Sequence, residues 1–116
     1  VFETEYNFRA GAALWDKLQA VGADAAYIAD DELAIGVLDG AIDRGIKVPD
    51  DFQIITSNNT VLTEMARPQL SSISQPLYDI GAVAMRLLTK MMNKEAVTEK
   101  TVLLPFTITE RQSTKA

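Results

Sequence analysis

The longest periodic pattern of apolar residues lies between Pro76 and Asn93 and predicts one long helix. Proline suits the first position of a helix, because its missing N–H would have no partner there in any case. Apolar side chains recur at steps of three and four residues, which places them on one stripe of the helix: Leu77, Ile80, Ala84, Leu87, Leu88 and Met91. Just before this helix, residues Leu70 to Ser74 predict a short strand.

The face opposite this apolar stripe carries Asp79, Val83, Arg86 and Lys90, which fall in one narrow sector at about 100° per residue. Arg86 and Lys90 are one turn apart, so both cations can reach a single anion. Tyr78 lies on the flank of this face. Two interpretations stay open. One is a solvated helix face with a single exposed valine, which is common in proteins. The other is a small docking face with an apolar centre and a basic end that suits phosphate.

The rest of the chain alternates between helical patterns and short apolar runs of strand length. Helices are predicted to start at Asn7, at Asp30 or Asp31 and at Val61; strands are predicted at residues 25–29, 52–56, 101–104 and 106–109. Gly22 and Gly45 are placed to end the first two of these helices. The polar tail from Gln112 to Ala116 is predicted to be loose. Such alternation predicts an α/β fold, a mostly parallel sheet flanked by helices.

On the helix that starts at Asp30 or Asp31, the pattern also predicts which residues face the core. They are Ala34, Ile35, Leu38, Ala41 and Ile42. This helix and the loop after residues 52–56 both follow predicted strands, so their polar residues belong to the edge where parallel sheets bind ligands. Four candidates result, Asp30, Asp31, Asn58 and Asn59. The plainer alternative for the two aspartates is helix capping, which stabilises a helix by about 0.5–2 kcal/mol.

Composition removes several functional classes. The formal net charge is −5, so the chain by itself is a poor DNA binder. Without histidine or cysteine it lacks the commonest general base, the commonest metal ligands and any disulfide. It also has no glycine-rich phosphate loop and no apolar run long enough to span a bilayer. We therefore predict no enzyme, no catalytic or metal site, no cofactor and no membrane contact. The chain begins at Val1 without a methionine, which predicts a piece of a longer protein.

An acidic pair at a strand end could also hold Mg²⁺, as in response-regulator receivers. Such a site needs a phospho-accepting aspartate at the end of a central strand. The strand at residues 52–56 is followed by Ser57 and Asn58 instead, so we set this hypothesis aside.

Motifs spread from about Asn7 to Thr114 form one recognisable pattern. They are DELAIG (31–36), GIKVPDDF (45–52), PQLSSISQP (68–76), QPLYDIGAVAMRLLTK (75–90) and ERQST (110–114). Together they resemble the LacI/GalR family of transcriptional repressors, and within it the catabolite control proteins of Gram-positive bacteria. The resemblance implies a periplasmic-binding-protein-like core of two lobes, of which this chain holds a part.

The same resemblance implies how the chain is divided between the lobes. Residues 1–69 would belong to the C-terminal lobe, residues 70–97 would carry the long helix into the N-terminal lobe, and residues 98–116 would be a return strand and tail. The apolar stripe would then lack its native neighbours in this chain alone, so we expect the chain to self-associate.

The implied function is that of a regulatory-core fragment of a cytoplasmic repressor of carbon catabolite control. Such a protein would form a homodimer and would bind operator DNA only through an N-terminal domain that is missing here. Its corepressor would be the serine-phosphorylated phosphocarrier HPr. By this resemblance, Arg86 would meet the phosphoserine, with Lys90, Tyr78, Asp79 and Val83 around it.

The resemblance also assigns Asp30, Asp31, Asn58 and Asn59 to an effector cleft between the lobes. Members that respond to sugars or purines have an Asn-Asp pair where Asp30 and Asp31 stand, and often an aspartate in the loop of Asn58 and Asn59. Both departures weaken the case for tight sugar binding and fit a protein corepressor. Two alternatives remain. A periplasmic-type sugar-binding protein would show a signal peptide on its gene, and a small α/β enzyme would need a base that no residue here signals.

Overall fold

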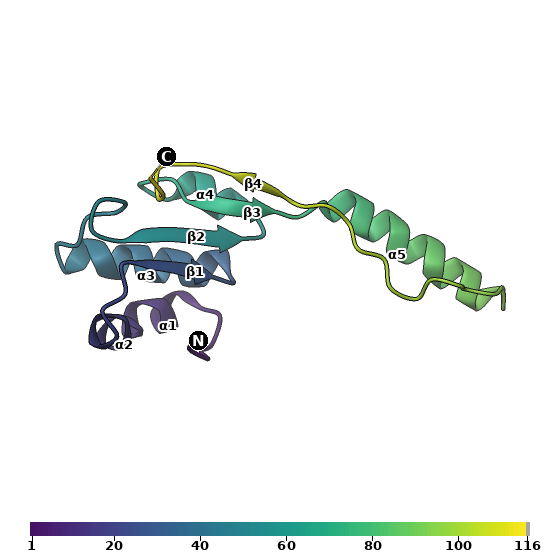
Figure 1. The fold of residues 1–116 in the computed structure, drawn as a ribbon, viewed down its shortest axis with the longest axis horizontal. Coiled ribbons are helices and arrows are strands. Elements are labelled where there is room, and N and C mark those ends of the chain that lie inside the picture. The colour runs from purple at the N-terminus through teal and green to yellow at the C-terminus, as the bar shows by residue number, and fades with distance from the viewer. Residues whose placement is uncertain (116) are drawn as a thin grey trace. The chain divides into compact units, whose positions relative to one another are not determined.

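The computed structural model describes residues 1–115 and divides the chain into two compact units. Unit 1 contains Val1–Ser74 together with the chain from Ile108 onward, and unit 2 is Gln75–Thr107. Figure 1 shows the elements of both units, which are described separately below. Which lobe of an intact core each unit belongs to stays a prediction.

Five helices and four strands make up the described chain, and β1, β2, β3 and β4 follow one another in that order in one sheet. The helices are α1 (Phe8–Ala13), α2 (Trp15–Ala20), α3 (Asp31–Asp43), α4 (Val61–Met65) and α5 (Leu77–Met92). The strands are β1 (Ala25–Ile28), β2 (Gln53–Ser57), β3 (Ser71–Ser74) and β4 (Thr107–Thr109). Strands β1, β2 and β3 run parallel, with Tyr27 opposite Ile55 and Thr56 opposite Ser72. The predicted α/β class and mostly parallel sheet are confirmed.

Local capping explains where the helices of unit 1 begin and end. The Oδ1 atom of Asn7 accepts a hydrogen bond from the Ala10 N–H at 2.8 Å, and Asp30 caps α3 by accepting from the Leu33 N–H at 3.1 Å. Gly22 and Gly45 have φ values of +68° and +72° after α2 and α3. These left-handed positions favour glycine, as the sequence predicts.

Two predicted elements differ from the structure. The first helix is interrupted at Leu14, whose N–H bonds to the carbonyl of Gly11 at 3.2 Å, so the chain forms α1 and α2 instead of one helix. The predicted strand at residues 101–104 is wrong, because that stretch has no regular structure. Pro105 follows it and lacks the N–H that a sheet requires, and strand structure resumes only at Thr107.

The core of unit 1 is built around α3. The Trp15 indole N–H donates to the Val37 carbonyl at 2.8 Å, and the Trp15 and Phe52 rings meet edge to face with centroids 4.9 Å apart. Ala34, Leu38 and Ala41 are buried as predicted, Ile35 packs against the cluster, and Leu33 and Val37 are buried in addition. The prediction for Ile42 is wrong, because 54% of it is exposed. Helix α3 buries more than one side because α1 packs on it as well as the sheet.

Helices α1 and α3 cross where each has a glycine. A Cβ built on Gly36 would overlap the carbonyl oxygen of Phe8, and one built on Gly11 would overlap the carbonyl oxygen of Leu33. Both obstacles are backbone atoms, which cannot rotate away. The two glycines therefore permit an approach that no larger residue allows.

The carboxyl-terminal segment is held firmly at the sheet, so the prediction of a loose tail is wrong for the described residues 112–115. Ser113 is completely buried; its N–H donates to the Gln69 carbonyl at 3.0 Å and its Oγ accepts from the Ser71 N–H at 2.8 Å. The Lys115 N–H donates to the Gln53 side chain at 2.8 Å. Polar residues suit this position because backbone groups of β2 and β3 would otherwise lack partners.

Candidate functional site

The carboxyl ends of β1 and β2 bring the predicted cleft residues to one edge of the sheet of unit 1. Asp30 and Asp31 follow β1 at the start of α3, while Asn58 and Asn59 follow β2. This is the place where open parallel sheets bind ligands. The contacts of each side chain show which of these residues remain available for that purpose.

The carboxylate of Asp31 is engaged inside the protein. Only 2% of Asp31 is exposed, and its oxygens accept from the Thr56 hydroxyl at 2.9 Å, the Thr60 N–H at 2.8 Å and the Thr60 hydroxyl at 2.6 Å. A buried carboxylate needs such donors, because desolvation would otherwise be costly. Asp31 therefore ties the start of α3 to the loop after β2. Direct contact between Asp31 and a ligand stays a prediction, and it would require this buried carboxylate to become accessible.

Asp30 is half-buried, and one of its oxygens caps α3. Nearby, the Tyr27 hydroxyl donates to Ser57 Oγ at 3.3 Å, and Ser57 Oγ donates to the Ala29 carbonyl at 2.8 Å. The Tyr27 ring itself is 59% exposed at the end of β1. Capping thus accounts for Asp30 structurally, and its predicted role in the cleft is left as a prediction.

The loop after β2 turns through two left-handed residues, Asn58 with φ +82° and Asn59 with φ +50°. Asparagine tolerates this conformation better than most side chains. The Asn59 N–H donates to Ser72 Oγ at 3.1 Å, and its side-chain oxygen accepts from Thr63 Oγ1 at 3.3 Å and from Arg111 at 2.8 Å. Asn59 is therefore fixed in place from several directions.

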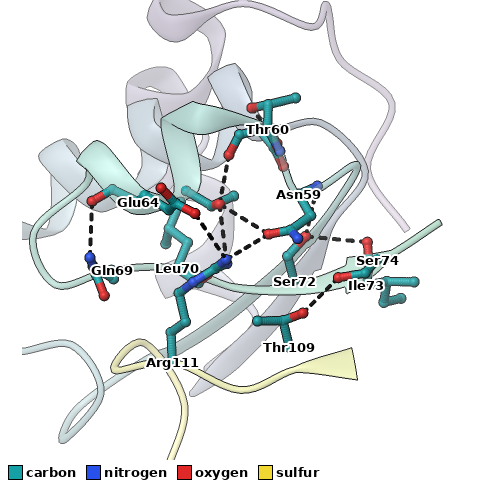
Figure 2. Close-up of polar contacts among 12 residues, drawn as sticks. Asn59, Thr60, Glu64, Gln69, Leu70, Ser72, Ile73, Ser74, Thr109 and Arg111 are labelled. Carbon is teal, nitrogen blue, oxygen red and sulfur yellow. Dashed lines mark hydrogen bonds and ion pairs between the residues drawn. The ribbon is translucent and has the colours of Figure 1, made fainter. Parts of the chain in front are cut away.

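Arg111 is the residue at this edge that the sequence did not single out. Its side chain is 13% exposed and donates to the Leu70 carbonyl at 2.8 Å, to Thr63 Oγ1 at 3.1 Å and to Asn59, while Glu64 lies 4.0 Å away (Figure 2). Guanidinium groups only donate, so the Asn59 amide must turn its oxygen toward Arg111 and its NH₂ elsewhere. The one signal in the sequence is the place of Arg111 in the ERQST motif, which says nothing about its partners.

In unit 2, the five residues of the predicted docking face all lie on α5. Tyr78 is 87% exposed, Asp79, Arg86 and Lys90 are exposed, and Val83 is half-buried. Within residues 1–115 neither Arg86 nor Lys90 forms an ion pair. None of the described residues therefore neutralises the two cations by direct contact, and their role in docking stays a prediction.

The basic end of the docking face is one wall of a small pocket. The pocket has a volume of about 160 Å³, and the other wall is the segment that follows α5. Its lining residues are Arg86, Leu87, Lys90, Ala96, Val97, Thr98, Glu99 and Val102. The cations therefore face a concave site and not only open solvent, which the helical periodicity could not predict.

Most of the apolar stripe of α5 is exposed among the described residues: Leu87 is half-buried where it lines the pocket, and no residue of this helix is fully buried. Leu77 and Met91, near its two ends, are 61% and 62% exposed. An amphipathic helix of this kind normally packs its apolar side against another element. Here that neighbour is not among residues 1–115.

Neither a metal site nor a membrane span emerges from the described residues. Across residues 1–115, no three His, Cys, Asp or Glu side chains are grouped so that they could hold a metal ion. None of the helices there has the length and hydropathy needed to cross a membrane.

Comparison with known proteins gives consistent matches over almost the whole chain. Residues 1–114 match the family described as periplasmic binding protein-like domain. The chain is 52% identical over 115 residues to catabolite control protein A of Streptococcus mutans, covering 99% of this chain and 34% of that protein. It is 50% identical over 117 residues to the Priestia megaterium protein of the same name, covering 99% and 35%. The chain thus spans about a third of the length of these relatives.

Solved structures agree with the sequence matches. The transcription regulator CcpA of Lactococcus lactis superposes with a TM-score of 0.93 at 47% identity, over 99% of this chain and 42% of that one. A LacI family transcriptional regulator from Enterococcus faecium, solved with bound ribose, gives a TM-score of 0.78 at 28% identity, over 96% and 42%. The resemblance to LacI/GalR regulators, and to catabolite control proteins in particular, is confirmed.

Proposed function

Since the chain belongs to the periplasmic binding protein-like family, in the branch of the LacI/GalR transcription regulators, we propose that it is part of a repressor's regulatory core. The repressor acts in the cytoplasm on genes of carbon catabolite control. It works as a homodimer, and a separate N-terminal domain outside this chain contacts operator DNA. No catalytic step is part of the proposal, because the relatives are transcription regulators.

The corepressor in this proposal is serine-phosphorylated HPr, which docks on α5. The observation that carries the proposal is the pair Arg86 and Lys90, exposed, one turn apart and without an ion pair in the described chain. A guanidinium can hold a phosphate by two parallel hydrogen bonds, and the ammonium group adds a second positive charge. Val83, Tyr78 and Asp79 then form the surrounding contact.

A titration of the protein with both forms of HPr tests this proposal. We expect Arg86→Ala to weaken the phosphorylated form by about 2–5 kcal/mol, the range for truncating one member of a buried charge pair. The unmodified form should be affected far less. Val83→Asp should weaken both forms, because it damages the apolar centre and not the phosphate contact.

Arg44→Ala is the matched control for Arg86→Ala. Arg44 is also an exposed arginine, its ion pair with Asp16 spans 3.4 Å, and it lies in unit 1. Its loss changes the net charge equally and should leave HPr binding unchanged, since exposed pairs contribute little. If Arg86→Ala bound phosphorylated HPr as tightly as the wild type, α5 would be only a solvated helix surface.

A small effector at the sheet edge is a second candidate function. The Enterococcus faecium regulator was solved with bound ribose, and the same edge here carries Asp30, Asp31, Asn58 and Asn59. The inward hydrogen bonds of Asp31 favour Asp30 and the asparagines as direct contacts. Ribose added in a thermal-unfolding assay tests this role, and a stabilisation that Asn59→Ala removes would support it.

A further inference from the structure

The pocket at the basic end of the docking face contains one acidic side chain. Glu99 lines it together with Arg86 and Lys90, and all three belong to unit 2. Figure 1 shows the segment after α5 running back along that helix. Glu99 of this segment lines the same pocket as two cations that precede it in the chain.

The charges around this pocket interact without forming a closed pair. Glu99 lines the same pocket as Arg86 and Lys90, and salt screens charges over a Debye length of about 8–10 Å, so the carboxylate lowers the positive potential there. Yet among residues 1–115 Glu99 is in no ion pair. The carboxylate therefore weakens the pull of the cations on an anion and leaves the cavity open to one.

We propose that Glu99 sets the strength of the anion site on α5, competing for Arg86 and Lys90 with the phosphate of the docking partner. This inference rests on the function proposed above. A phosphoserine carries about −1.5 to −2 charges against −1 for a carboxylate, so phosphate wins the cations and Glu99 yields. An unmodified serine brings no charge and gains nothing from the site. This competition keeps the corepressor complex reversible, because the Glu99 carboxylate can interact with Arg86 and Lys90 again when the phosphate dissociates.

The test compares Glu99→Gln with Glu95→Gln in titrations against phosphorylated and unmodified HPr. Glu95 is exposed, comes shortly after α5 and does not line the pocket, so its neutralisation makes the same change in net charge. We expect Glu99→Gln to tighten the phosphorylated form about two- to fivefold, the range for exposed charge pairs. The unmodified form should not respond, and Glu95→Gln should affect neither. At about 1 M salt, where the Debye length is near 3 Å, the gain should disappear.

A second variant asks whether Glu99 acts through the cations. In a Lys90→Gln background the gain from Glu99→Gln should shrink, since part of the charge it opposes is gone. Equal gains from Glu99→Gln and Glu95→Gln would overturn the inference, because they would reflect overall charge alone. If Arg86→Ala abolished binding while Glu99→Gln left it unchanged, the inference would fail and the docking proposal would stand. If Arg86→Ala had no effect, both would fail.

Discussion

Arg111 in unit 1 and Arg86 in unit 2 are both arginines, but their surroundings differ. Arg111 is nearly buried and donates to Asn59, Thr63 and the Leu70 carbonyl. Arg86 is exposed on α5, where the described chain supplies no ion-pair partner. A buried cation must be satisfied by its own chain, whereas an exposed cation in a concave site can be satisfied from outside. The comparison separates an arginine that holds the fold from one whose predicted role is to bind a partner.

Apolar residues show the same contrast. Trp15 and Phe52 are almost completely covered by the core of unit 1, whereas Leu77 and Met91 of the apolar stripe are exposed. Scattered exposed apolar residues are normal, but a continuous stripe on one helix indicates a missing neighbour. Unit 1 therefore carries its own core, and we expect unit 2 to need contacts with a neighbour outside the described residues or with a second copy.

The largest effect should come from filling the glycine crossing in unit 1. We expect Gly36→Ala to destabilise the protein by about 3 kcal/mol or more, because the new methyl group meets the Phe8 backbone and α1 must move away from α3. The measurement is the urea unfolding midpoint followed by Trp15 fluorescence. An unchanged midpoint would mean that the two helices do not approach as closely as the structure shows.

The next effect concerns the two arginines directly. Arg111→Ala should cost about 2–4 kcal/mol of unfolding free energy, because the Leu70 carbonyl and the Asn59 side chain lose a charged donor inside the protein. Arg86→Ala should change stability by less than about 0.5 kcal/mol, as is usual for surface positions. Equal costs for the two variants, measured by urea unfolding, would contradict the division between structural and partner-binding arginines.

A third prediction concerns the bare apolar stripe. We expect this chain by itself to self-associate through the stripe and to bind an apolar dye, since burying each large side chain contributes about 1.5–3 kcal/mol. Leu88→Glu should shift the chain toward monomer in sedimentation experiments. Thr89→Glu adds the same charge at an exposed position outside the stripe, so it should leave association intact. A wild-type chain that is strictly monomeric and binds no dye would argue against a missing neighbour.

Sequence patterns predicted the elements whose cause is local and failed where the cause lies far along the chain. Helix α5, the caps at Asn7 and Asp30 and the turns at Gly22 and Gly45 follow from short-range rules, and all are present. These features depend on periodicity, side-chain capping and left-handed φ values, which neighbouring residues determine.

The missed features depend on tertiary contacts. The tail at residues 112–115 looks like a loose polar terminus, yet it supplies partners to β2 and β3. Arg111 reaches Asn59 across 52 positions of the chain, and Glu99 faces Arg86 only because the segment after α5 turns back. The sequence correctly predicted that Asp30, Asp31, Asn58 and Asn59 lie at the carboxyl ends of strands. It could not show that the Asp31 carboxylate accepts hydrogen bonds from Thr56 and Thr60.

The smallest expected effect is a gain in stability from replacing a glycine by alanine in α5. The same replacement at Gly36 in unit 1 is expected to be the most destabilising. Gly81 lies inside α5, and a Cβ built there meets no atom within 4 Å. Alanine in a helix interior is favoured over glycine by about 0.8–1 kcal/mol, so Gly81→Ala should raise the helicity and thermal resistance of unit 2.

Circular dichroism of the wild-type chain and of Gly81→Ala and Gly36→Ala side by side measures this difference. Changes in stability of opposite sign for the two variants would sharpen the comparison between the units. They would show that the added methyl group meets a close neighbour in α3 and open space in α5. A loss of stability from Gly81→Ala would contradict this contrast between the two units. Such a loss would mean that α5 already packs against a second copy at Gly81, and that the glycine serves a close approach there too.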